Sequence, residues 1–251
     1  MKVVIPLWLF NTGLTFLKKL SKDVVLTYVI EIMPLTNHYE VRKDIERKLE
    51  KVAKKLEENG FETKTIVRLG NPGLDVARVA ERERADIIVV PVAEGFRRYV
   101  YGTLTNGVLT FSKIPVLVVK EYLYSNNVFE RPLIALPLDD PEFCLYILNV
   151  LRRVRRLVKH AIFYYAGKDD EKLKYYAERS GLSYELLRED KKGNLAKQIL
   201  KAAENVNATS IVVGRKPRLL DSVIMLGTAA TIVRKSKIPV LVIPRVKNLW
   251  T

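Results

Sequence analysis

The chain has 251 residues, enough for one large domain or two of ordinary size. Apolar residues make up 48% and charged residues 28%, so the chain can bury a core and is not a disordered polymer. One cysteine, Cys144, excludes an internal disulfide, and two histidines, His38 and His160, leave few ligands for zinc and few bases for a catalytic triad. We therefore expect a soluble protein of a reducing cytoplasm.

No apolar run reaches the roughly 20 residues that a membrane helix needs. The first ten residues are similar to a short signal peptide, but Pro6 interrupts the apolar run and no small-residue cleavage site follows. We expect neither a signal peptide nor a membrane span.

The net charge of +15 is placed unevenly along the chain. Residues 1–125 hold 20 basic and 15 acidic residues, whereas residues 126–251 hold 23 and 13. A positive field attracts phosphate groups on nucleotides, nucleic acid or anionic lipid, and composition alone does not choose among them.

The chain repeats itself, which indicates a tandem duplication. Five short blocks of the first half recur in the same order in the second half. The pairs are residues 3–7 with 134–138, 70–80 with 193–203, 85–91 with 208–214, 102–103 with 227–228, and 114–119 with 238–243. The periodic pattern lapses near residues 122–130, where Ser-Asn-Asn favours a turn, so we place the domains at 1–124 and 130–251.

Within each half, in chain order, the pattern predicts a strand followed by four helix–strand pairs. Runs such as residues 87–90 and 211–213 are apolar at consecutive positions, as in strands buried on both faces. Helical spacing of apolar residues is clear at Phe143, Ile147, Leu151 and Val154. The predicted fold class is α/β, with two doubly wound, Rossmann-like domains of five parallel strands.

The fourth strand of the second half leads into a loop with the composition of an anion site. It opens on Gly214, continues with Arg215, Lys216 and Arg218, and closes on Gly227-Thr228 at the predicted start of a helix. Glycine lets backbone N–H groups approach a phosphate, and a helix amino end offers free donors. We expect a branched side chain at position 227 both to block that approach and to strain the turn.

At these residues the chain resembles the universal stress protein family, whose nucleotide-binding members carry G-x-x-G-x9-G-[S/T] after the fourth strand and an Asp after the first. Gly214, Gly227 and Thr228 fit the motif, and Asp139 fits the first-strand Asp. Pro217 replaces the second glycine, which removes an N–H and fixes φ, and so weakens the expected phosphate grip.

The resemblance implies an adenine nucleotide alpha hydrolase-like fold and a role for each matching residue. Asp139 would contact the ribose or adenine, Gly214 and Gly227 would lie against ribose and phosphates, and Thr228 would bond a phosphate oxygen. Arg215 would add positive charge. It also implies that strands 116–119 and 240–243, otherwise bare edges, meet in an antiparallel pair, which would make the chain a pseudo-dimer.

The first half departs further from the family pattern. Leu7 stands where the second half has Asp139, Pro91 replaces Gly214, and only Gly102-Thr103 remains of the motif. We expect this degenerate half to bind no nucleotide in the family manner.

Simpler interpretations exist for several of these residues. Asp139-Asp140 fits a helix cap, and Gly227-Thr228 fits a plain helix start. The basic run at residues 152–160 fits a solvated helix end, with nucleic acid or lipid binding as the alternative. Cys144 fits a small buried residue better than a nucleophile.

The resemblance implies a universal stress protein that binds an adenine nucleotide, ATP with Mg²⁺, in its second half and acts as a regulatory or stress-sensing module. No residue is an obvious base for water, so any ATP hydrolysis should be slow. The alternative function is a scaffold that has lost nucleotide binding and acts through protein contacts, with or without further homodimerisation. A third reading is nucleic-acid binding through the basic second half.

Overall fold

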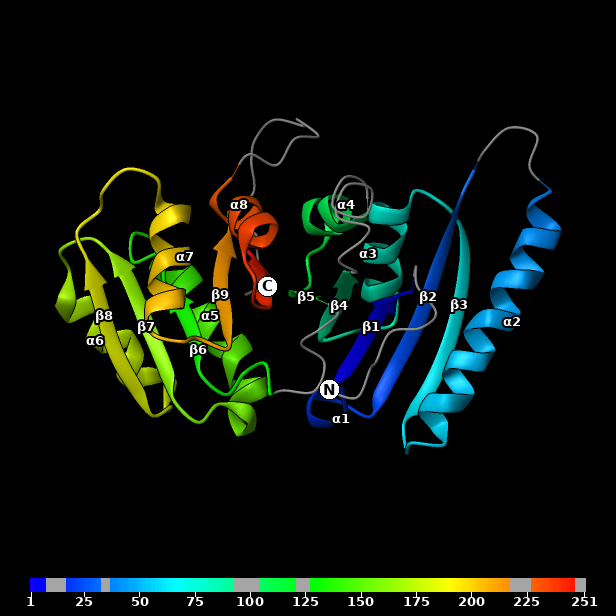
Figure 1. The fold of residues 1–251 in the computed structure, drawn as a ribbon, viewed down its shortest axis with the longest axis horizontal. Coiled ribbons are helices and arrows are strands. Elements are labelled where there is room, and N and C mark those ends of the chain that lie inside the picture. Colours follow the sequence, from blue (N-terminus) through cyan, green and yellow to red (C-terminus); the bar gives the residue numbers. More distant parts are fainter. Residues whose placement is uncertain (8–16, 33–36, 93–103, 121–126, 217–226, 247–251) are drawn as a thin grey trace. The chain divides into compact units, whose positions relative to one another are not determined.

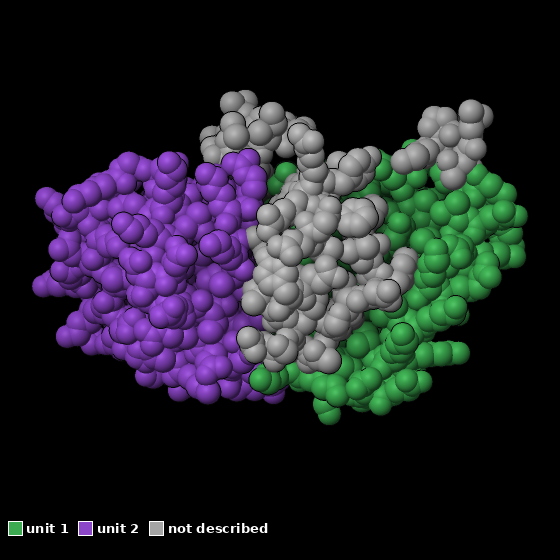
Figure 2. Space-filling view, viewed as in Figure 1, with its two compact units in different colours: residues 1–124 green, residues 125–251 purple. Residues whose placement is uncertain are grey.

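The computed structural model describes the chain except for residues 8–16, 33–36, 93–103, 121–126, 217–226 and 247–251 (Figure 1). The chain divides into two compact units, Met1–Tyr124 and Ser125–Thr251, which Figure 2 distinguishes by colour. Most of the segment predicted as the linker, near residues 122–130, falls outside the described residues. Each unit is described by itself below.

Unit 1 alternates strands and helices along the chain. Its described elements are β1 (Lys2–Pro6), α1 (Leu17–Leu20), β2 (Asp23–Glu31), α2 (His38–Glu57), β3 (Glu62–Gly70), α3 (Pro72–Arg82), β4 (Ile87–Val92), α4 (Leu104–Phe111) and β5 (Val116–Lys120). The strands pair in parallel in the order β3-β2-β1-β4-β5.

Unit 2 has the same alternation and the same strand order. Its described elements are β6 (Pro132–Ala135), α5 (Pro141–Val154), the 3-10 turn η3 (Arg155–Leu157), β7 (Ala161–Ala166), α6 (Asp170–Ser180), β8 (Tyr184–Glu189), α7 (Leu195–Asn205), β9 (Ser210–Arg215), α8 (Thr228–Lys235) and β10 (Val240–Pro244). The order β10-β9-β6-β7-β8, again all parallel, repeats that of unit 1 with the strands in corresponding places.

Helices cover both faces of the sheet in unit 2. Helix α5 packs against α6 and α7 packs against α8, and Figure 1 shows α7 and α8 in front of the strands that α5 and α6 cover from behind. The inner strands β6 and β9 are largely buried between them, with Ile211 and Val212 fully inaccessible. The predicted α/β class with doubly wound parallel sheets is confirmed.

Helices α5 and α8 lie where the sequence pattern predicts them. The four residues used to predict a helix are all buried on one side of α5 (Phe143, Ile147, Leu151 and Val154). Helix α8 begins at Thr228, directly after Gly227. Among the described residues no helix combines the length and the apolar character needed to cross a bilayer.

The same capping device opens the helix before the fourth strand in each unit. Asn71 accepts a hydrogen bond from the N–H of Leu74 at the start of α3, and Asn194 accepts one from Lys197 at the start of α7. In both, a glycine with positive φ precedes the cap, Gly70 at 151° and Gly193 at 62°. The duplication seen in the sequence therefore extends to the asparagine cap, while the two glycines differ in φ.

Candidate functional site

The strand order of unit 2 creates a switch point between β6 and β9. From β6 the chain moves outward to β7 and β8, and it then returns to the other side of β6 to form β9 and β10. Ala135 at the end of β6 lies in register with Val213 of β9. Crevices at such points, beside the carboxyl ends of the strands, are where doubly wound sheets bind ligands. The loop after β6 carries Asp139, and Lys216 follows β9 at the same edge.

Asp140, next to Asp139, is the helix cap. Its Oδ1 accepts a hydrogen bond from the N–H of Phe143 at 3.2 Å, and Pro141 occupies the first position of α5. Asp140 is therefore the residue that caps α5, and the carboxylate of Asp139 is not used for the cap.

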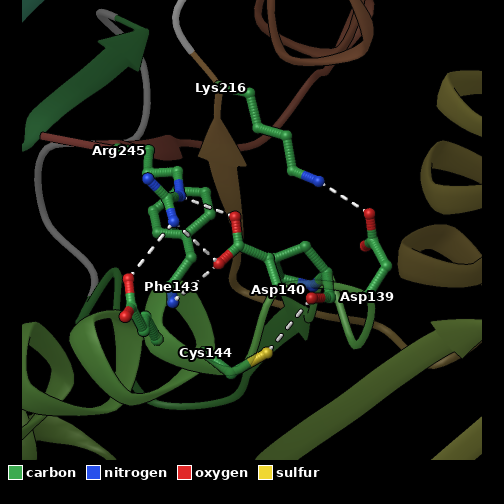
Figure 3. A network of polar contacts seen from close by, with 8 residues as sticks. Asp139, Asp140, Phe143, Cys144, Lys216 and Arg245 are labelled. Atoms are coloured by element: carbon green, nitrogen blue, oxygen red, sulfur yellow. Dashed lines mark hydrogen bonds and ion pairs between the residues drawn. The ribbon is translucent and has the colours of Figure 1, made fainter. Parts of the chain in front are cut away.

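Arg245, just after β10, fixes Asp140 from the other side (Figure 3). Its Nε donates to Asp140 Oδ2 at 2.6 Å and its Nη2 donates to Oδ1 at 3.2 Å, while Nη2 also lies 3.4 Å from Glu142 Oε2. The Asp140 side chain is only 14% exposed. The Arg245 hydrogen bonds, together with that from Phe143 N–H, lower the pKa of Asp140 despite its partial burial.

Cys144 stabilises the same loop as a neutral group. Its thiol donates to the carbonyl oxygen of Pro137 at 3.3 Å, and that oxygen also accepts from the N–H of Asp140 at 2.8 Å. Burial, reinforced by the charges of Asp140 and Asp139, raises the pKa of Cys144 to about 12. The thiol is therefore protonated at neutral pH and is not a nucleophile, as the sequence predicts.

Asp139 projects from this fixed loop into the open edge of the site. Its Oδ2 accepts a hydrogen bond from Lys216 Nζ at 2.7 Å, and the two side chains are 71% and 49% exposed (Figure 3). Sequence reasoning named both residues but could not show that they form an ion pair, because 77 positions separate them. No sequence pattern marked Arg245.

Gly214 is required by packing inside the unit. A Cβ built on it would lie 2.5 Å from Cε1 and 2.7 Å from Cζ of Phe143. The sequence analysis assigned this glycine to close approach of ribose or phosphate, but the close approach that the structure shows is to the Phe143 ring of α5.

Gly227, unlike Gly214, is not required by packing against any described residue. Its φ of −77° and ψ of 168° suit any residue, so the expectation that a side chain there strains the turn is wrong. None of the described residues has an atom within 4 Å of a Cβ built at this position. No side chain of the described residues caps the helix that starts here, and within that part of the chain the first N–H groups of α8 keep their capacity to bind an acceptor.

The remaining predicted residues are placed as follows. Thr228 is the first residue of α8 and is half-buried. Arg215 ends β9 half-buried, and burial lowers the pKa of its guanidinium, which stays charged at neutral pH. Pro217 and Arg218 lie outside the described residues.

The basic run and the histidine of unit 2 lie at the amino ends of the strands, opposite the candidate site. Helix α5 begins beside the carboxyl ends of the strands, where Asp139 lies. It therefore ends near the amino end of β7, and its exposed arginines lie there. His160 directly precedes β7, where its ring contacts Ser183 and Glu185. Neither feature is part of the switch-point site.

Unit 1 differs from unit 2 at the position that corresponds to Gly214. Pro91 pairs with Val119 of β5, as Gly214 pairs with Ile243 of β10, so the correspondence of Pro91 with Gly214 is confirmed by strand register. Gly102-Thr103 lies outside the described residues.

The expected correspondence of Leu7 with Asp139 is wrong. The N–H of Leu7 donates to Thr27 on the neighbouring strand, as the N–H of Leu136 donates to Tyr164, so Leu7 is level with Leu136. Leu7 is also fully buried. The position level with Asp139 follows three residues later, within residues 8–16, which the structure does not describe.

Among the described residues no cluster of three His, Cys, Asp or Glu side chains is arranged to hold a metal ion. A divalent cation at this edge would therefore take most of its oxygen ligands from a bound phosphate chain, as Mg²⁺ commonly does with nucleotides.

Fold and site together define a doubly wound α/β protein with a candidate anion-binding site in its second unit. Residues 9–120 and 145–244 match the universal stress protein family. Because the two matches, one in each unit, together cover most of the chain, the protein belongs to that family.

Individual relatives agree with this assignment. Universal stress protein MJ0577 of Methanocaldococcus jannaschii is 34% identical over 80 residues, which span 31% of this chain and 49% of that protein. Universal stress protein MJ0531 of the same organism is 28% identical over 116 residues, 41% of this chain and 68% of that protein. A crystal structure of a universal stress protein from Archaeoglobus fulgidus superposes with a TM-score of 0.76 at 25% identity, covering 97% of this chain and 96% of that chain.

The Asp140–Arg245 ion pair predicts a pH-dependent stability. At pH 7, Asp140→Asn should unfold at a lower urea concentration than the parent, because the amide keeps the cap but loses the charge. The lowered folded-state pKa means that this contribution is complete above the unfolded pKa of about 3.9 and is lost as the pH falls through the folded value. The difference in urea midpoint should therefore shrink below about pH 4. A difference that is constant down to strongly acidic pH would contradict the charged role, and Asp140→Ala should cost roughly 0.5–2 kcal/mol more through loss of the cap.

The packing role of Gly214 predicts a compensating pair of substitutions. Gly214→Ala places a methyl against the Phe143 ring and should destabilise the protein by about 1–3 kcal/mol in chemical unfolding. Adding Phe143→Leu should recover part of that loss. Gly227→Ser is the matched control, since it meets open space and can cap α8. Full stability of Gly214→Ala alone would refute the packing explanation.

Proposed function

We propose that unit 2 binds an adenine nucleotide, ATP with Mg²⁺, at the carboxyl edge of β6 and β9, and that unit 1 does not. Membership of the universal stress protein family supports this proposal, as does the fit of Gly214, Gly227 and Thr228 to the family's nucleotide motif. The observation that carries it is the open start of α8 at Gly227, beside an edge that also presents Asp139 and Lys216.

The phosphate end would be held at the start of α8. Uncapped N–H groups and the positive end of the helix dipole favour an anion there. With no described atom within 4 Å of a Cβ at Gly227, the absence of a side chain leaves room for a phosphate oxygen to reach the backbone. The Thr228 hydroxyl would donate to the same group, and the ammonium of Lys216 would add charge.

The nucleoside end would be held by the β6–α5 loop. The Asp139 carboxylate can accept hydrogen bonds from ribose hydroxyls or from the adenine amino group. The loop is fixed on both sides of Asp139 by the Asp140 cap, the Arg245 ion pair and the bonds to Pro137 carbonyl oxygen. A fixed acceptor loses little conformational entropy on binding, which favours affinity.

The chemistry at this edge supports a regulatory role. The histidine of unit 2 lies at the opposite edge, Cys144 is protonated, and Asp139 is paired with a lysine. No side chain among these is placed to take a proton from an attacking water, so the nucleotide would act as a signal and be hydrolysed slowly at most. The bound state would then report nucleotide supply to a protein partner.

Calorimetric titration with ATP tests the proposal. Saturation should occur at one nucleotide per chain, because only Gly102-Thr103 of the family's nucleotide motif remains in unit 1. Gly227→Val should lose the most affinity by blocking phosphate approach. Asp139→Ala should lose roughly tenfold to a hundredfold, and Thr228→Ala about fivefold, since backbone donors remain.

The controls separate binding from folding. Asp44→Ala removes another lysine-paired carboxylate, from α2 of unit 1, and should leave the affinity unchanged. Circular dichroism should show every variant folded. Two equivalent sites per chain, or unchanged affinity in both Gly227→Val and Asp139→Ala, would overturn the assignment. A protein that binds no nucleotide at all would favour the scaffold function.

A further inference from the structure

Two neighbouring aspartates at the candidate site are held in contrasting ways. Asp140 is 14% exposed and receives two hydrogen bonds from Arg245, itself 28% exposed. Asp139 is 71% exposed and receives one from Lys216, which is 49% exposed. The first pair has the bidentate geometry of a structural contact, whereas the second is a single bond from a flexible side chain (Figure 3).

An exposed pair of this kind contributes little to folding. Solvent screens its charges, and holding a long lysine side chain in one rotamer costs entropy, so the net stabilisation is close to zero. Lys216 can therefore leave Asp139 at low cost when a better partner arrives. The Arg245 pair, with two bonds and less solvent, does not exchange so easily.

A phosphate chain is such a partner. An ammonium group carries three donors and no preferred plane, so it transfers readily from a single carboxylate to a group with more negative charge. When it transfers, the Oδ2 atom of Asp139 becomes available for the ribose or base. A nucleoside without phosphate offers nothing to attract the ammonium, so it gains no contact from Lys216 and shares the Asp139 carboxylate with it.

We propose that Lys216 makes the site selective for phosphorylated nucleotides over nucleosides, because its ammonium moves from Asp139 to a phosphate and adds a contact that a nucleoside cannot make. This inference rests on the proposed nucleotide site and adds a specificity residue to it. The exchange moves one ammonium between two anions and makes or breaks no covalent bond. Lys216 is thus a binding residue. Without a nucleotide it pairs with Asp139, the acceptor proposed for the nucleoside.

The test compares ATP with adenosine by calorimetry on the full chain. In Lys216→Met the ATP affinity should fall by about tenfold or more, the loss typical of a charge-assisted contact. Adenosine affinity should stay the same or rise, because its competitor has gone. Lys216→Arg, which retains the charge, should keep most of the preference for ATP. Raising the salt concentration should weaken ATP binding more in the parent than in Lys216→Met.

Lys64→Met is the matched control. Lys64 pairs with Glu83 at 2.7 Å in unit 1, the same distance as the Lys216 pair, and its loss should change neither affinity. Equal losses for ATP and adenosine in Lys216→Met would overturn the inference, since they would mean that Lys216 only shapes the loop. An unchanged ATP affinity would also overturn it. A parent protein that binds neither compound would instead defeat the underlying nucleotide site.

Discussion

The parallel pairing of β6 with β9 is the constraint on which the candidate site depends. These strands are far apart in sequence, yet their register sets Ala135 opposite Val213 and brings their carboxyl ends to one edge. Both are buried among apolar neighbours, and a slip in register by one residue would turn their side chains to the wrong faces of the sheet. The hydrophobic core therefore fixes where Asp139 and Lys216 meet.

Around that edge the structure separates residues that hold the loop from residues that remain available. Asp140, Arg245 and Cys144 hold the β6–α5 loop through contacts with little exposure to solvent. Asp139 and Lys216, which stay exposed, are paired only by an exchangeable contact. The same distinction holds for the glycines, because Gly214 is required by the Phe143 ring and Gly227 by nothing in the described chain. The functional proposal rests mainly on residues that do not hold the fold together.

The repeat and the strand and helix order could be predicted from sequence because they depend on local periodicity. The buried face of α5 and the start of α8 follow from spacing and helix-end chemistry, and both are found. Contacts between distant segments could not be predicted: Arg245 reaches Asp140 across 105 positions, and sheet register brings them together. Sequence similarity also misleads, since aligning residues 3–7 with 134–138 makes Leu7 the counterpart of Leu138, next to Asp139, while the sheet places it level with Leu136.

We propose that this member of the universal stress protein family binds a nucleotide in unit 2, at the carboxyl ends of β6 and β9. The most direct measurement is a crystal structure of the full chain with a non-hydrolysable ATP analogue. The account predicts the analogue at the start of α8, with Lys216 Nζ bonded to a phosphate oxygen and the Asp139 carboxylate bonded to the nucleoside. An analogue bound at any other edge or in unit 1, or one bound while the Lys216–Asp139 pair stays intact, would contradict it.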